Sequence, residues 1–241
     1  MFLCGKKLKK NKSLLKKQTH TKLIILVDPD KYSPELISRA NNCKVAYIFI
    51  GGSLVNKILF EKTVKSIKKI TKIPLIIFPG DETQVSKHAD CILILSLLSG
   101  RNPEYLIGKH VKAASKIKAS KIKTIPVGYI LVDGSKISTT QKITNTKPLS
   151  SKKEIIETAI AGEFLGKKLI YLEAGSGAKK TINSSIISEV KNSISIPLIV
   201  GGGIDSVLKA KAILISNPDY MVVGNALEED PDFLLKLNKL F

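Results

Sequence analysis

Residues 197–225 read PLIVGGGIDSVLKAKAILISNPDYMVVGN, and they contain the unit from which the fold follows. Two short apolar runs, residues 197–200 and 220–223, flank a segment of helical length at residues 205–216. Glycine follows each apolar run directly. Continuous runs of Ile, Val and Leu are typical of strands that are buried on both faces of a parallel sheet, with helices as crossovers. The stretch therefore predicts a strand–helix–strand unit whose strands end in glycine-rich turns.

The same alternation runs through the chain. Strands are predicted at residues 23–27, 45–50, 74–78, 91–95, 124–132, 169–173, 197–200 and 220–223. Helices are predicted at residues 34–42, 56–71, 84–88, 103–119, 152–166, 183–193, 205–216 and 231–240. Eight such units in 241 residues indicate an α/β fold, a single (β/α)8 TIM barrel. A doubly wound open sheet is the alternative, but it seldom uses eight units in so short a chain.

The domain organisation follows from the first strand. Residues 1–22 form a basic lead-in and residues 23–241 form the catalytic barrel domain. One connection, residues 133–151, is long and polar, which is typical of a functional or disordered loop. The lead-in is interpreted either as a solvated segment or as a basic amphipathic segment that lies on a membrane surface.

Composition excludes several classes of protein. The formal net charge is +19, and all but two of the 39 basic residues are lysines. Base readout favours the planar fork of arginine, so we expect no nucleic-acid partner. A lysine-rich surface suits anionic substrates or an anionic membrane face, and compositional drift is the alternative explanation. The charge alone would also allow a non-enzymatic basic protein bound to nucleic acid or membrane, with steeply salt-dependent binding.

Cysteine usage and apolar run length indicate the compartment. Cys4, Cys43 and Cys91 are widely separated and form no CxxC pair, so neither a disulfide framework nor a zinc site is supported. The apolar runs are too short to span a bilayer, and residues 1–22 lack the apolar core of a signal peptide. We therefore predict a cytoplasmic protein.

Three glycine clusters follow the last three predicted strands: Gly175-Ser176-Gly177, Gly201-Gly202-Gly203 and Gly224-Asn225. In such barrels the active site lies at the carboxyl ends of the strands, and phosphate commonly binds after strands seven and eight. Glycine lets backbone N–H groups approach phosphate oxygens closely. Because a single glycine turn is needed sterically in many loops, the prediction of a phosphate cup rests on the three clusters together.

Two acidic positions indicate chemistry beside this cup. Glu173 ends an otherwise apolar strand, and strand alternation places it on the same side as Tyr171, towards the barrel interior. A buried carboxylate without a partner is costly, so the functional interpretation is a general base. Asp28 and Ser53 end the first two strands, and a carboxylate with a hydroxyl suits Mg²⁺ whose other ligands are water and diphosphate. A turn-forming role for Asp28 before Pro29 is the alternative.

Taken together, these residues resemble the geranylgeranylglyceryl phosphate synthase family, which includes bacterial heptaprenylglyceryl phosphate synthases, and more closely its second subgroup. The matching segments are LVDPDK at 26–31, FIGGSLV at 49–55, PLIIFPG at 74–80, SGRNPEYLIGKH at 99–110, PVGYILVDG at 126–134, YLEAGSGA at 171–178, PLIVGGGI at 197–204 and VVGNAL at 222–227. They run in register over nearly the whole chain.

The resemblance implies an activity and a set of site residues. The activity is Mg²⁺-dependent transfer of a polyprenyl group, expected to be geranylgeranyl, from its diphosphate to the C3 hydroxyl of sn-glycerol 1-phosphate, which forms an ether-lipid precursor. The resemblance implies Mg²⁺ at Asp28 and Ser53, with Glu173 and Tyr171 as catalytic residues. The acceptor would bind at Tyr171, Leu172, Glu173, Ala174, Gly175, Ser176, Gly177, Gly202, Gly203, Gly224 and Asn225.

Further expectations concern the donor and the assembly. The resemblance implies an apolar groove for the prenyl tail, with Phe78, Pro79 and Tyr129 as candidates, and a homo-oligomer, dimeric or larger. Peripheral membrane contact stays open. Because a phosphate cup alone is shared with other barrels, the alternative function is an isomerase acting on a small sugar or triose phosphate, with Asp28 opposite Glu173.

Overall fold

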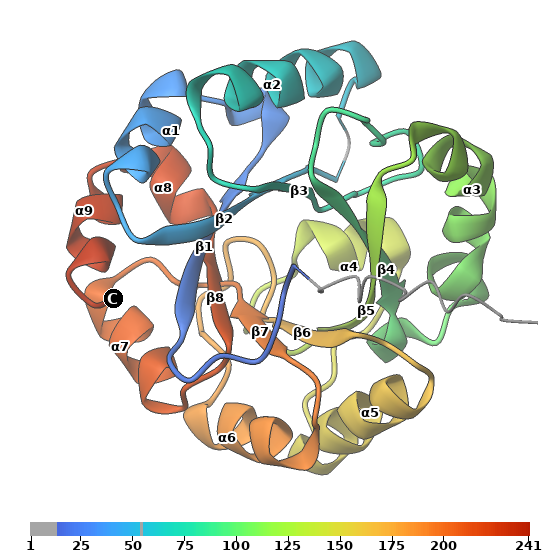
Figure 1. The fold of residues 1–241 in the computed structure, drawn as a ribbon. Helices are drawn as coiled ribbons and strands as arrows, with labels where there is room; N and C mark the ends of the chain where they lie inside the picture. The colour runs from blue at the N-terminus through green and yellow to red at the C-terminus, as the bar shows by residue number, and fades with distance from the viewer. Residues whose placement is uncertain (1–13, 54) are drawn as a thin grey trace, which may run out of the picture.

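The structure, a computed structural model, describes residues 14–53 and 55–241, and within them eight parallel strands close into a barrel. Each strand pairs with the next in sequence, and β1 pairs with β8 to close the ring. Figure 1 shows the strands at the centre and the helices around them. The strands are β1 (Lys22–Val27), β2 (Val45–Ile50), β3 (Leu75–Ile77), β4 (Cys91–Leu97), β5 (Lys123–Leu131), β6 (Leu169–Glu173), β7 (Leu198–Gly201) and β8 (Tyr220–Val223).

The predicted barrel is therefore confirmed, and the ends of all eight strands agree with the sequence prediction to within two residues. The surrounding helices are α1 (Pro34–Asn41), α2 (Lys57–Ile70), α3 (Lys109–Ser120), α4 (Thr139–Thr144), α5 (Lys152–Phe164), α6 (Ser184–Ser193), α7 (Val207–Ile215), α8 (Asn225–Glu229) and α9 (Phe233–Asn238). Short turns of other helix types are η1 (Pro29–Lys31), η2 (Leu98–Gly100) and η3 (Glu104–Gly108).

One predicted helix, residues 84–88, is wrong, because the fully described segment between β3 and β4 contains no helix. The side chain of Gln84 is completely buried there and binds the neighbouring turns instead. Its amide nitrogen donates to the carbonyl of Gly52 (2.6 Å), and its Oε1 accepts from the N–H of Gly80 (3.2 Å). These bonds tie the segment to the ends of β2 and β3, whereas so short a helix would have little intrinsic stability.

The long connection after β5 is folded. The Ser138 hydroxyl accepts from the N–H of Gln141 (3.2 Å), and the Gln141 side chain accepts from the N–H of Ser138 (2.7 Å). This reciprocal capping box starts helix α4. The connection then returns to the barrel, where Leu149 pairs with Val132. Residues that were predicted as a polar loop thus build a structured cover.

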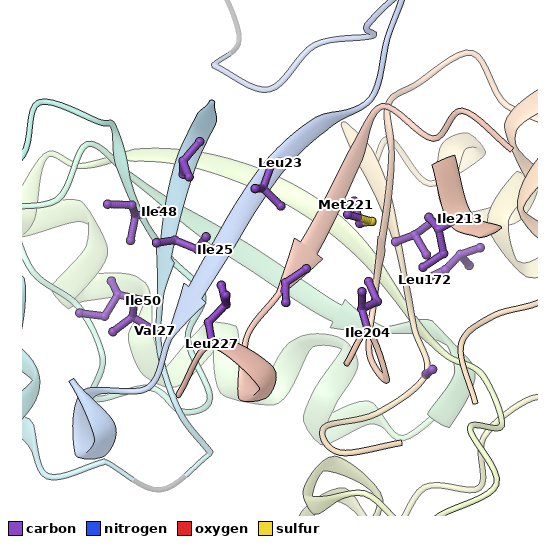
Figure 2. Close-up of a cluster of buried hydrophobic side chains, with 14 of the residues drawn as sticks. Leu23, Ile25, Val27, Ile48, Ile50, Leu172, Ile204, Ile213, Met221 and Leu227 are labelled. Carbon is purple, nitrogen blue, oxygen red and sulfur yellow. The ribbon is translucent and has the colours of Figure 1, made fainter. Parts of the chain in front are cut away.

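Two apolar layers hold the barrel together. Side chains on one side of each strand, among them Leu23 and Ile25 of β1, pack against the helices. Figure 2 shows Met221 of β8 beside Ile213 of α7. Alternate side chains point into the barrel and form a second cluster that includes Ile24, Phe49, Tyr171 and Tyr220. Because both faces of the strands are buried, packing holds every strand in position in the barrel.

Residues 14–21 close the amino-terminal end of the barrel. Leu15 is 2% exposed and belongs to the interior cluster. The Tyr220 hydroxyl accepts from the N–H of Lys16 (3.0 Å) and donates to the Lys16 carbonyl (2.9 Å), and the Tyr47 hydroxyl donates to the carbonyl of Leu14 (2.6 Å). Residues 1–13 of the predicted lead-in lie outside the described residues. Among the helices that the structure describes, none has the length and apolar character needed to cross a membrane.

Candidate active site

A cavity of about 700 Å³ opens at the carboxyl ends of the strands, opposite the end that residues 14–21 close. Most of the predicted site residues meet in it, although they come from widely separated parts of the sequence. Those that line it are Asp28, Ser53, Tyr171, Glu173, Ser176, Gly177, Gly202, Gly203, Gly224 and Asn225. The predicted cup, base and metal ligands therefore share one space.

Three predicted binding residues do not line this cavity. The side chains of Leu172 and Ala174 are buried in the outer layer between strands and helices. Gly175 packs against Ser138, where a Cβ atom on Gly175 would lie 2.7 Å from the Ser138 Cβ. These three residues position the loop after β6 through packing. Only their backbone atoms could contact a ligand.

Glu173 is a buried acid with an unusual titration range. Its side chain is 8% exposed, and its Oε1 accepts a hydrogen bond from the N–H of Gly175 (2.8 Å). Burial raises the pKa of the Glu173 carboxyl group to about 7, although the Gly175 N–H and the nearby Tyr171 hydroxyl partly oppose this rise. A carboxyl group that titrates near neutral pH is suited to accept a proton during a reaction.

Tyr171 lies inside the barrel with its hydroxyl group beside Glu173. The hydroxyl is buried, and its geometry falls short of a hydrogen bond to any described residue. Burial, reinforced by the Glu173 charge, raises the pKa of the Tyr171 phenol well above its ordinary value. The phenol therefore keeps its proton, and its hydroxyl group can donate a hydrogen bond to a ligand.

Gly201 and Gly202 leave the space that this pair occupies. A Cβ atom on Gly201 would lie 2.4 Å from the Tyr171 hydroxyl oxygen and 3.0 Å from Oε2 of Glu173. A Cβ atom on Gly202 would lie 2.3 Å from Oε1 of Glu173, and Gly202 also has a φ of +87°. The sequence indicated Gly202 for phosphate binding. It did not indicate that residue 201 must lack a side chain for Tyr171 to fit.

The remaining glycines shape the cup. Gly177 and Gly203 line the cavity, and their φ values of +65° and +69° are ones that residues with side chains rarely adopt. The Ser176 hydroxyl donates to Oδ1 of Asn225 (2.9 Å) and joins the loops that follow β6 and β8. Each of the three predicted clusters thus contributes at least one glycine to the cavity: Gly177, Gly202, Gly203 and Gly224.

Asp28 has the turn-forming role that the sequence offered as an alternative, and its side chain also faces the cavity. Its Oδ1 accepts from the N–H of Asp30 (3.0 Å), so it caps the turn η1, and it also lines the cavity. A Cβ atom on Gly52 would lie 2.8 and 3.0 Å from the two carboxylate oxygens, so this glycine makes room for them. One carboxylate and the Ser53 hydroxyl fit a Mg²⁺ ion that keeps water and phosphate oxygens as its other ligands.

The other half of the cavity is apolar. Phe78 and Tyr129 lie beside Tyr171, with ring centroids 5.5 and 5.3 Å from the Tyr171 ring, and Pro79 lines the same wall. Residues that the sequence analysis did not identify extend this half along β4, η3, α3 and α4; they include Leu95, Tyr105, Ile117 and Ile143. In the sequence these residues do not differ from other apolar residues, so the sequence does not indicate that they line a groove.

Comparison with known proteins gives consistent matches over nearly the whole chain. The sequence profile of the PcrB family matches residues 16–239. Geranylgeranylglyceryl phosphate synthase of Chitinophaga pinensis is 44% identical over 219 residues, which cover 88% of this chain and 87% of that protein. The protein of the same name from Pyrococcus furiosus is 36% identical over 225 residues, which cover 90% of this chain and 88% of that protein.

A solved structure gives the same result. The crystal structure of (S)-3-O-geranylgeranylglyceryl phosphate synthase from Thermoplasma acidophilum, in complex with its substrate sn-glycerol-1-phosphate, superimposes with a TM-score of 0.83. That protein is 30% identical, and the match covers 92% of this chain and 95% of that one.

Proposed function

Because the chain belongs to the PcrB family, we propose that it is a prenyltransferase that joins a geranylgeranyl group to the C3 hydroxyl of sn-glycerol 1-phosphate. One observation carries this proposal. The buried carboxyl group of Glu173 lies in a cavity that has a glycine-lined polar end and an apolar end. Such a cavity accommodates a phosphorylated acceptor and a long apolar donor together, and an isomerase for small sugar phosphates has no use for the apolar half.

The acceptor is held at the polar end. The backbone of Gly177, Gly203 and Gly224 surrounds its phosphate group, and the Tyr171 hydroxyl orients its glycerol part. The Glu173 carboxylate takes the proton of the C3 hydroxyl as that oxygen attacks the donor. Holding both reactants in place can lower the barrier by roughly 7–11 kcal/mol at best.

The donor lies with its tail in the apolar half. The bond between the first prenyl carbon and the diphosphate oxygen breaks, and the diphosphate leaves with the bonding electron pair. The acceptor oxygen forms the ether bond to that carbon, and its proton passes to Glu173. Asp28 and Ser53 would hold Mg²⁺, which supplies charge neutralisation for the leaving diphosphate.

The reaction can be tested directly. Purified protein is incubated with labelled sn-glycerol 1-phosphate, Mg²⁺ and polyprenyl diphosphates from C15 to C35, and the lipid fraction is extracted. We expect label in that fraction with the C20 donor, and loss of it with EDTA, with Asp28→Asn and with Glu173→Gln. Lys142→Met, which changes an exposed residue of α4 outside the cavity, serves as the control. No transfer from folded protein with any donor would refute the proposal.

Contact with a membrane forms a second part of the proposal. The donor is an amphiphile that partitions into membranes, and the chain carries a net charge of +19, so we propose peripheral contact with anionic membranes. Co-sedimentation with vesicles that contain anionic lipid, weakened by salt and absent with neutral vesicles, is the expected result. Equal binding to neutral vesicles would contradict it.

We also propose that the chain forms homo-oligomers. Phe164 and Leu165 at the end of α5 are 83% and 72% exposed, and Ile215 at the end of α7 is 83% exposed. Contact between copies would remove this apolar surface from water. Light scattering after size exclusion should give a mass that is a multiple of the 26.3 kDa chain, and a monomer at micromolar concentration would contradict it.

A further inference from the structure

Lys136 lies beside the glycine cup although it belongs to a different part of the chain. It comes from the connection between β5 and α5 and lines the cavity. A Cβ atom on Gly177 would lie 3.3 Å from the Lys136 Nζ. We propose that Lys136 binds the phosphate group of the acceptor, as a cation added to the backbone donors of the cup. This inference rests on the proposed function.

The backbone on both sides of Lys136 is fixed to the cup. The carbonyl of Gly134 accepts from the N–H groups of Lys179 (3.1 Å) and Lys180 (3.2 Å), which follow β6. Ser138 is 1% exposed and packs against Gly175. Lys136 lies midway between these two anchors, so its stem starts from a defined position at the edge of the cup.

The other lysines of the cavity are already paired. Three lysines line it among the described residues. Lys31 Nζ lies 2.8 Å from Glu228, and Lys109 Nζ lies 2.8 Å from Glu82. The structure gives Lys136 no ion pair within the described part of the chain. Lys136 is therefore the cavity lysine whose charge remains available to an incoming phosphate.

The charge balance of the cavity favours such a cation. Seven carboxyl groups line the cavity in the described residues, against the three lysines. Glu228, Glu82 and Asp205 are paired with Lys31, Lys109 and Lys209, whereas the other carboxyl groups of the cavity oppose the binding of a phosphate. A lysine ammonium close to the phosphate forms a charge-assisted hydrogen bond, the stronger kind. Its loss should raise the KM for sn-glycerol 1-phosphate by about 10- to 100-fold.

The test compares Lys136→Met with Lys136→Arg and with the control Lys142→Met. For each protein the KM of both substrates is measured, and binding of sn-glycerol 1-phosphate and of inorganic phosphate is measured by calorimetry. We expect Lys136→Met to weaken both phosphate ligands and to leave the KM for geranylgeranyl diphosphate within about two-fold. Lys136→Arg should retain much of the affinity because it keeps the charge, and the control should match the wild type.

Several outcomes would overturn the inference. They are unchanged affinity of Lys136→Met for both phosphate ligands, an equal loss in Lys142→Met, or a change confined to the KM of the diphosphate donor. If the wild type transfers no prenyl group, the proposed function fails, but calorimetry still decides whether Lys136 holds phosphate. If transfer occurs and the affinity of Lys136→Met is normal, the inference alone fails.

Discussion

A Cβ atom on Gly201 would lie 2.4 Å from the hydroxyl oxygen of Tyr171, so the backbone of β7 and the side chain of β6 share a space that excludes any larger residue. The same atom would lie 3.0 Å from Oε2 of Glu173. The strand that borders the cup therefore also sets the position of the acid and the phenol.

Gly201→Ala should reduce kcat by about 100-fold, because displacement of reacting groups by about 1 Å costs that much. The backbone at residue 201 is not in the left-handed region, so strain does not complicate the result. Gly166→Ala is a control for lost stability alone: its φ is +81° and no atom lies within 4 Å of its Cβ position, so it should cost stability through backbone strain and leave kcat unchanged. A normal kcat for Gly201→Ala would show that Tyr171 and Glu173 can be displaced without loss of activity.

The rate should depend on pH through Glu173. Its pKa of about 7 means that the carboxyl group is largely protonated below pH 7 and ionised above it. A base must be ionised to accept a proton, so kcat/KM should rise through pH 7 and level off at higher pH. Glu173→Gln should remove most of the activity and this pH dependence. A profile that is flat between pH 6 and pH 8 in the wild type would refute this role.

Glu173 should also make stability depend on pH. Its pKa in the folded chain, about 7, exceeds the unfolded value of about 4.3, so the folded state binds the proton more tightly. The free energy of unfolding should therefore fall as pH rises from about 4.5 to 7, by about 3 kcal/mol from this group. Glu173→Gln should be more stable than the wild type at pH 8, with a smaller advantage at pH 5.

Urea unfolding of both proteins at the two pH values measures this difference. Glu157→Gln changes an acid whose side chain is 62% exposed and should give little effect at either pH. An advantage of Glu173→Gln that is equal at pH 5 and pH 8 would assign it to packing rather than to ionisation.

A substitution at the closed end of the barrel should lower stability and leave the activity unchanged. Leu15→Ala removes a side chain that is 2% exposed in the interior cluster, and should lower the free energy of unfolding by about 2–5 kcal/mol. Leu208→Ala changes a leucine of α7 that is 79% exposed and should cost little. Because Leu15 lies at the end opposite the cavity, kcat at a temperature where both variants are folded should match the wild type.

The sequence predicted the barrel well because its strands carry a local signal. A strand buried on both faces is a continuous apolar run, and Gly or a polar residue ends each one, so pattern and structure agree at β6 and β8. Residues 84–88 gave the wrong helix because Gln84 is held by Gly52 and Gly80, contacts that a local pattern does not contain. The helix α4 carried a usable signal, since Ser138 and Gln141 have capping-box spacing.

The site was less predictable where it depends on contacts between residues of different strands and loops. Glu173 could be identified because an acid at the end of an apolar strand is conspicuous. Lys136 could not, since it is one of 39 basic residues and its place beside Gly177 arises from the return of the β5–α5 connection over the cup. The sequence placed Gly201 in a phosphate cup but did not predict that it makes room for Tyr171 and Glu173, because these neighbours come from another strand.

The closed end also fixes an order of events during synthesis. Gln18 bonds through its backbone N–H to Asp219 and through its side chain to Tyr220, about 200 residues later in the chain. At about 5–20 residues per second, the ribosome needs roughly 10–40 s to make that stretch. The amino-terminal segment must wait for its last partners throughout this time. A nascent chain stalled before Asp219 therefore leaves the apolar interior open to water, where chaperones and proteases can reach it.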